Sequence, residues 1–195
     1  SAGPIHQGAF YRFKYNIKDK LKFGQENLLE VTVSKMSADA SVNNAERLAD
    51  YWIFGGIFRP VYLEAFPTQH IAYTAIDAKA NGAFSMKAHL VNPQPGQEVV
   101  GEIMNTAGKV VGTGRATVSK DTLVTLTTTV PNPLQWTAET PHLYTVNTYI
   151  KAGKKNLYLT SEKFGFRTIE IRQGDGIYLN GTKINDMGYH LDAWD

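Results

Sequence analysis

Short alternating segments separated by turn residues dominate the chain from residue 71 to residue 160, and they constrain its fold more than any other feature. In the clearest of them, Phe84, Met86, Ala88 and Leu90 alternate with polar residues, as a half-buried strand requires. The predicted strands begin at Ile71 and continue through 84–90, 99–104, 109–118, 123–130, 143–150 and 157–160. About seven strands in roughly 100 residues are typical of an immunoglobulin-like β-sandwich, so the sequence predicts an all-β fold.

The first 66 residues carry a weaker version of the same pattern. Residues 11–17 alternate as a half-buried strand does, and Leu29, Val31 and Val33 alternate in a second one, with a turn at 24–27 between them. Residues 34–49 are polar and small, which predicts a surface loop with one helical turn around 45–49. Pro67 marks the boundary to the sandwich.

Composition excludes several classes of protein. The chain has 195 residues and 43% hydrophobic residues, enough for a sizeable core in two units. Its net charge of +2 is spread along the sequence without a long basic run, so neither nucleic acid nor an anionic membrane is an expected partner. There is no cysteine, hence no disulfide and no thiolate metal site. No apolar run reaches the roughly 20 residues that span a bilayer.

Four strings carry more information than composition does. The first reads Asp50-Tyr51-Trp52-Ile53-Phe54-Gly55-Gly56-Ile57-Phe58-Arg59-Pro60-Val61-Tyr62-Leu63, in which paired glycines permit a sharp turn among large side chains. The others are PLQWTAETPHLY at 133–144, FGFRTIE at 164–170, and GIYLNGTKI at 176–184 with an Asn-Gly hairpin turn. Together they resemble glycoside hydrolase family 2, the family of β-galactosidases and β-glucuronidases.

The resemblance implies a division of the chain. Residues 1–66 are expected to form the C-terminal part of a sugar-binding-like jelly roll, 67–169 the immunoglobulin-like sandwich, and 170–195 the opening hairpin of a TIM barrel that is itself absent. The expected fold class is thus all-β, a partial galactose-binding-like jelly roll followed by an immunoglobulin-like β-sandwich. Because the two glutamates of the family's retaining mechanism belong to the barrel, no catalytic residue is expected in this chain, which alone should be inactive.

Asp50 is the strongest candidate for a substrate contact. The resemblance implies that this aspartate projects into the mouth of the active site, where it holds a sugar hydroxyl or, in some members, a monovalent cation; a carboxylate suits either ligand. Trp52 is a candidate platform at the same mouth, and Asn43 and Asn44 are weaker candidates. The competing interpretations are a turn residue for Asp50, core packing for Trp52 and plain loop polarity for the asparagines.

The resulting hypothesis is a non-catalytic accessory region of a glycosidase that cleaves terminal β-linked sugars, with β-galactosidase ahead of β-glucuronidase. Its expected partners are its own TIM barrel and a carbohydrate substrate, and a homo-oligomer is compatible with it. No cofactor is expected for this chain, although Na or Mg is compatible with the parent enzyme. A periplasmic or secreted location is favoured over the cytoplasm. The alternatives are a stand-alone carbohydrate-binding module and a structural β-sandwich module.

Overall fold

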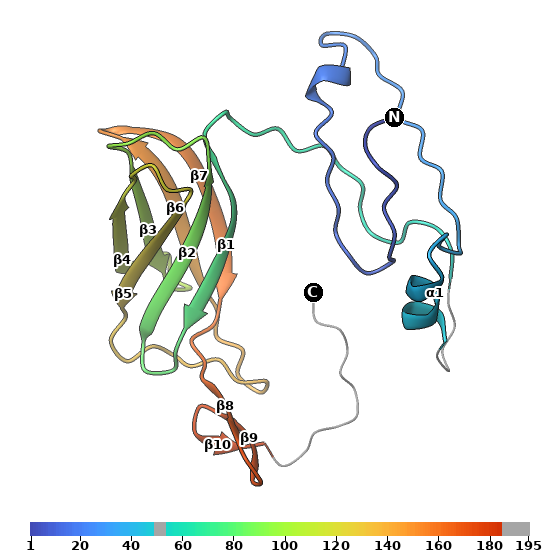
Figure 1. The fold of residues 1–195 in the computed structure, drawn as a ribbon. Helices are drawn as coiled ribbons and strands as arrows, with labels where there is room; N and C mark the ends of the chain where they lie inside the picture. Colours follow the sequence, from blue (N-terminus) through green and yellow to red (C-terminus); the bar gives the residue numbers. More distant parts are fainter. Residues whose placement is uncertain (49–53, 185–195) are drawn as a thin grey trace. The chain divides into compact units, whose positions relative to one another are not determined.

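The computed structural model describes residues 1–48 and 54–184, and the chain divides into two compact units (Figure 1). The first unit spans Ser1–Leu63 and the second Glu64–Asp195. Across the described residues, no helix is long and apolar enough to cross a membrane.

The first unit contains two short helices, η1 at Lys18–Lys20 and α1 at Ala40–Arg47, and its described residues form no strand. The predicted strands at 11–17 and 29–33 are therefore not found. Within the described residues neither segment is paired in a β-ladder, and several of their apolar side chains stay exposed, for example Phe13 at 52% and Val31 at 53%. Alternation alone does not make a strand, because a ladder needs a partner for its N–H and C=O groups.

The polar loop of the first unit is more helical than the sequence predicted. Helix α1 has eight residues and ends at Arg47, whereas one turn around 45–49 was expected. Asp39 is the reason: its side chain accepts a hydrogen bond from the backbone N–H of Ser41 at 2.8 Å, which caps the helix. The predicted turn at 24–27 is confirmed, with Asn27 closing it through hydrogen bonds to Lys22.

The second unit is an immunoglobulin-like sandwich of seven antiparallel strands in two sheets (Figure 1). One sheet has the order β1-β2-β5 and the other β4-β3-β6-β7. The strands are β1 His70–Ala78, β2 Ala83–Val91, β3 Glu98–Met104, β4 Val110–Thr117, β5 Leu123–Thr129, β6 Tyr144–Ala152 and β7 Lys155–Phe164. All seven were predicted, and the all-β fold class is confirmed.

The hydrophobic core fills the space between the two sheets. Met86 and Leu126 face it from the first sheet, and Ile103 and Val146 from the second, all with no exposed surface. Gly101 lies opposite them in β3, where an added Cβ would stand 3.1 Å from Leu126 Cδ1 and 3.6 Å from Met86 Cε. Glycine at this position therefore makes room for the longer side chains of the facing sheet.

A third, smaller sheet follows the sandwich. It consists of β8 Ile169–Arg172, β9 Gly176–Leu179 and β10 Thr182–Lys183, in the order β10-β9-β8. The predicted Asn-Gly turn joins β9 to β10, with positive φ at both Asn180 (51°) and Gly181 (82°), as a type I′ turn requires. We call residues 169–184 the exit hairpin; it extends from one end of the sandwich (Figure 1).

Candidate functional site

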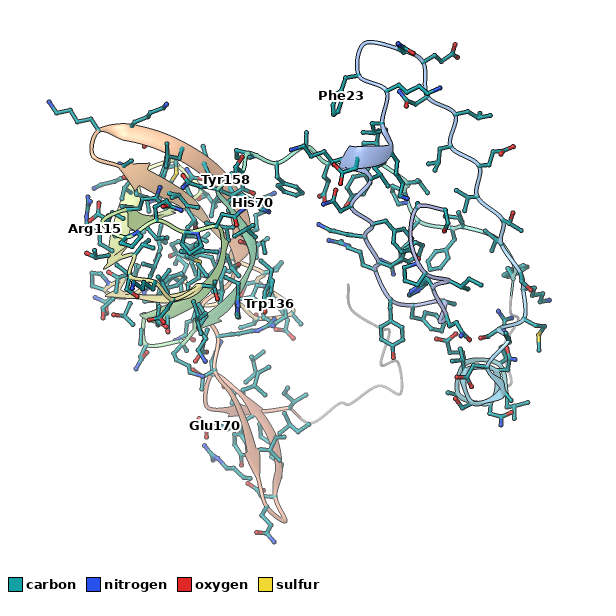
Figure 2. All side chains as sticks on the ribbon, turned by 45° about the horizontal axis from the view of Figure 1, so that its top comes forward. Phe23, His70, Arg115, Trp136, Tyr158 and Glu170 are labelled. Carbon is teal, nitrogen blue, oxygen red and sulfur yellow. The ribbon has the colours of Figure 1, made fainter. Side chains whose placement is uncertain are left out.

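The exit hairpin leaves the sandwich where three segments meet, and several hydrogen bonds hold this junction together. Backbone hydrogen bonds join Trp136 N to the Phe166 oxygen and Arg167 N to the Ala78 oxygen, both at 2.9 Å. Thr168 adds a third link, because its hydroxyl accepts a bond from Ala80 N at 3.0 Å. Figure 2 shows Trp136 at this end of the sandwich, near the hairpin that carries Glu170.

Four aromatic rings close the core beneath the junction. Phe84 and Phe164 lie 5.1 Å apart between ring centroids, and Phe166 contacts Phe164 and Tyr144 edge-on at 5.2 and 5.0 Å. The Tyr144 hydroxyl accepts a hydrogen bond from Leu134 N at 2.9 Å, so the polar tip of this buried ring is satisfied. The junction therefore rests on a rigid, close-packed base.

Trp136 packs directly against the backbone at Gly165. A Cβ added to Gly165 would lie only 2.6 Å from Trp136 Cβ and 2.8 Å from its Cγ, so no other residue fits without displacing the indole. The Arg167 guanidinium stacks over the indole ring, with 4.8 Å from Cζ to the centroid. In this string Gly165 leaves space for the Trp136 side chain, Phe166 is buried in the core, and Arg167 covers the indole ring.

Asn180 locks the hairpin turn to the sandwich. Its backbone N–H donates to the Thr168 oxygen at 2.8 Å, and its side-chain Oδ1 accepts from Thr168 N, also at 2.8 Å. Its Nδ2 donates to the Trp136 oxygen at 3.0 Å. Both ends of the carboxamide are therefore used in fixing the hairpin against the sandwich.

A hollow of about 610 Å³ lies beside the junction, between the end of β1 and the end of β7. Trp136, Leu143 and Ile169 contribute apolar surface to it. Charged side chains surround them: Asp77 pairs with Lys79 at 2.9 Å, and the Glu162 carboxylate accepts the Thr74 hydroxyl hydrogen bond at 2.6 Å. The hollow is therefore lined by both apolar and charged residues, and polar groups contribute the larger share of its surface.

The exit hairpin carries its own charge network. Lys183 Nζ lies 2.6 Å from Asp175 Oδ1, and the Tyr178 hydroxyl donates to the other oxygen of Asp175. These two hydrogen bonds, the lysine's first, lower the pKa of Asp175. The hydrogen bond from Arg172 to Glu170 raises the pKa of that guanidinium, which also stacks 3.6 Å from the centroid of Tyr178.

Of the residues predicted to contact substrate, Asp50 and Trp52 lie outside the described residues. The prediction that Asp50 binds a monovalent cation therefore also lies outside them. Asn43 uses its carboxamide within the loop: Oδ1 accepts from Ser37 N at 2.9 Å and Nδ2 donates to the Ser37 oxygen at 2.8 Å. Asn44 is exposed on α1. Their proposed role in sugar binding stays a prediction.

The segment that carries Asn43 and Asn44 is hydrogen-bonded to the start of the chain. The Glu46 carboxylate accepts the Ala9 N–H at 2.9 and 3.1 Å, and the Gln7 side-chain oxygen accepts from Asp39 N at 3.1 Å. Sequence reasoning missed both braces, as it missed the roles of Asn180 and Arg167 at the junction. The Asn-Gly turn pointed to the position of Asn180, but nothing in the sequence indicated which distant groups its side chain would reach.

Within residues 1–48 and 54–184, no three His, Cys, Asp or Glu side chains gather as metal ligands would. Three of the charged pairs described above, Asp77 with Lys79, Glu170 with Arg172 and Asp175 with Lys183, lie at the surface. What the described geometry offers is rigid support for the exit hairpin and a hollow beside it.

Fold and junction together define the class: an immunoglobulin-like sandwich that carries a short three-stranded sheet at a fixed orientation. The family model described as "Glycosyl hydrolases family 2" matches residues 66–167, more than half of the chain. The chain belongs to glycosyl hydrolase family 2. The match covers the sandwich together with Trp136, Gly165 and Arg167 of the junction.

Curated relatives are similar over nearly the whole chain. A β-galactosidase of Thermoanaerobacter pseudethanolicus is 28% identical over 94% of this chain, and one of Priestia megaterium is 30% identical over 97%. A putative β-glucuronidase of Formosa agariphila is 26% identical over 95%. The chain spans only 25%, 19% and 23% of these three relatives, respectively.

Solved structures agree on the fold. A family 2 member from Bacteroides cellulosilyticus matches 68% of this chain with a TM-score of 0.60 and 22% identity, and this chain covers 19% of it. A β-glucuronidase of glycoside hydrolase family 2 matches 60% of the chain with a TM-score of 0.50 and 21% identity. At these identities the likeness concerns the fold.

Proposed function

We propose that this chain is the non-catalytic accessory region of a larger glycosidase that cleaves terminal β-linked sugars by a retaining mechanism. The observation that carries the proposal is the combination of family membership with extent: relatives named as β-galactosidases match almost all of this chain, yet the chain spans a quarter or less of their length. The two carboxylates of a retaining mechanism are assigned to the remainder of the parent protein.

The sandwich serves this function as a rigid support. Its core, the aromatic base and the hydrogen bonds of Asn180 hold the exit hairpin in one orientation. Positioning of groups around a substrate is a major part of catalysis, and displacements of about 1 Å can cost on the order of a hundredfold in rate. A stiff connection on the approach to a catalytic domain supports accurate placement of that domain.

Asp50 and Trp52 are the proposed substrate contacts. A carboxylate accepts hydrogen bonds from adjacent sugar hydroxyls, and an indole offers an apolar surface for the face of a sugar ring. The braces at Gln7 and Glu46 support the proposal, because they fix the helix that leads into this string. Asn43 and Asn44 are secondary candidates on the same helix.

β-Galactosidase is the proposed activity, with β-glucuronidase as the second candidate, because relatives of both names match the chain at similar identity. The two substrates differ at one point, where the glucuronide carries a carboxylate that requires a cationic or hydrogen-bonding partner in the enzyme. Parallel hydrolysis of nitrophenyl β-galactoside and nitrophenyl β-glucuronide by the native protein separates the two activities.

The proposal is tested by the intact mass of the native protein from its source cells, set against the 21.6 kDa of this chain. We expect a mass several times larger and hydrolysis of an aryl β-glycoside. In that protein, Asp50→Ala should lower kcat/KM by about tenfold to a hundredfold, the usual effect of losing a charged hydrogen bond to substrate. A native mass near 21.6 kDa would instead favour the stand-alone carbohydrate-binding or structural module.

A further inference from the structure

Met104 lies beside a second hollow, on the face of the four-stranded sheet that is turned away from the core. It is the last residue of β3, it is partly buried, and a bulge in the pairing of β3 with β4 lies at this point. Across the neighbouring strands, Thr145 of β6 and then Lys163 of β7 follow it in register. All three line this second hollow, which has a volume of about 410 Å³.

The sulfur of Met104 has a polar partner. Asn147 Nδ2 donates a hydrogen bond to Met104 Sδ at 2.9 Å, and Asn147 Oδ1 accepts one from the Ser161 hydroxyl at 2.6 Å. A thioether is only a weak acceptor, whereas a carboxamide N–H is an ordinary strong donor. Asn147 therefore holds a good donor, fixed by Ser161, against an atom that uses it poorly.

Two other methionines provide the comparison. Met86 has no exposed surface and belongs to the core, where the Thr148 hydroxyl is its polar neighbour at 3.8 Å. Met36, in the first unit, is 55% exposed. Met104 is intermediate between these two, because its side chain is partly buried but borders the second hollow.

The chemistry open to such a thioether is oxidation by a peroxide. A sulfur lone pair attacks one oxygen of hydrogen peroxide, the O–O bond breaks, and the other oxygen leaves as hydroxide, which becomes water on taking up a proton. The sulfur loses two electrons and becomes a sulfoxide, a polar group that disrupts a packed core and that sulfoxide reductases convert back to the thioether. At Met104 the added oxygen, which is about the size of a water molecule, has space in the second hollow.

We propose that Met104 is a site of reversible oxidation by peroxides, and that Asn147 Nδ2 binds the sulfoxide oxygen. The modified side chain keeps its hydrogen bond, because the oxygen is a stronger acceptor than the sulfur that it replaces. The sandwich stays folded, because the methionine of its core, Met86, is shielded from the oxidant. This inference goes beyond the proposed function and does not depend on it.

The first test measures oxidation at each methionine by peptide mass. Trypsin places Met36, Met86 and Met104 on separate peptides, 36–47, 80–87 and 88–109. In the folded 195-residue chain treated with hydrogen peroxide, Met104 should gain oxygen at least about tenfold faster than Met86, which reacts only through local opening. In guanidinium chloride the three methionines should react at similar rates. A folded-state rate at Met104 as low as that of Met86 would overturn the proposal.

The second test examines the partner of the new oxygen. In a nitrogen-15 NMR spectrum, peroxide should shift the Asn147 side-chain amide signals and slow their exchange with water, because the donor gains a stronger acceptor. Met104→Leu is the matched control, since its Asn147 signals should not respond to peroxide. If the wild-type signals also stay unchanged while peptide 88–109 gains oxygen, the assignment of Asn147 as the partner is wrong.

The third test asks whether the fold tolerates the modification. Peroxide treatment should change the Tm of the 195-residue chain by less than about 3 °C, and methionine sulfoxide reductases should then remove the oxygen from peptide 88–109. A larger loss of Tm that Met104→Leu prevents would show that the second hollow does not accommodate the sulfoxide. Failure of the reductases to restore Met104 in the folded chain would show that the modification is not reversible there.

Discussion

Replacing Gly165 by alanine should disrupt the junction, because the new methyl group would collide with the Trp136 side chain. The new Cβ would lie 2.6, 2.8 and 2.9 Å from three atoms of Trp136, whereas carbon atoms prefer about 3.5–4.0 Å. Relief requires the indole to move by about 1 Å, which strains the Trp136 N to Phe166 O hydrogen bond and the Arg167 stack. Overpacking of this kind costs about 1–3 kcal/mol, and the stack adds about 0.5–1 kcal/mol.

The loss should appear as a lower melting temperature of the 195-residue chain. For a unit of this size each kcal/mol corresponds to about 3–5 °C, so Gly165→Ala should lower Tm by roughly 5–20 °C in near-ultraviolet circular dichroism. A double-mutant cycle with Trp136→Gly identifies the cause, because the alanine methyl group has nothing to collide with once the indole is gone. An unchanged cost in that background, or a Tm shift below about 2 °C for the single variant, would refute the steric argument.

Three further predictions concern single polar groups. Asn180→Gly keeps the positive φ but removes the carboxamide, so it should destabilise the second unit by about 1–3 kcal/mol and speed hydrogen exchange at the Thr168 amide; unchanged exchange there would contradict the lock. Burial first, then Glu102, raises the pKa of Tyr149, so Glu102→Gln should lower that pKa while leaving it above the usual value in a ¹³C NMR titration. With a raised pKa in the folded state, the free energy of unfolding falls as pH rises from the unfolded value through the folded one. The pKa of Asp175 is lowered, so the stabilising effect of this carboxylate is present above its unfolded-state pKa and is lost as pH falls through its folded-state pKa. Lys183→Met should raise the pKa of Asp175. An unchanged Asp175 titration in that variant would show that the ion pair does not form in solution.

The sandwich could be predicted from the sequence because its evidence is local. Alternation such as that of Phe84 to Leu90 specifies both the strand and the face that it buries. In the exit hairpin, likewise, the Asn-Gly pair specifies the turn between β9 and β10. The same reasoning failed at residues 11–17 and 29–33, where alternation is present but the described chain supplies no paired strand. Pairing is a property of two segments and cannot be deduced from one.

The junction could not be predicted, because its contacts join residues far apart in the sequence. Trp136 and Arg167 were recognised only as parts of motifs, and Asn180 only as a turn residue. Their actual neighbours follow from the sheet order rather than from any local pattern. Asn180, for example, bonds to Trp136, which lies 44 residues away in the sequence. The substrate contacts proposed at Asp50 and Trp52 rest on sequence alone, since both residues lie outside the described part of the chain.

The turn between β6 and β7 lies at the far end of these strands from the junction, and this separation has a practical use. Gly153 has a positive φ of 59° and open space around it, so this turn tolerates an inserted tag or a fluorophore. The nine residues of β6 place such a label about 30 Å from the hairpin end of the sandwich, at roughly 3.3 Å per residue. A reporter attached there would follow the motion of the whole sandwich without touching the junction that fixes the exit hairpin.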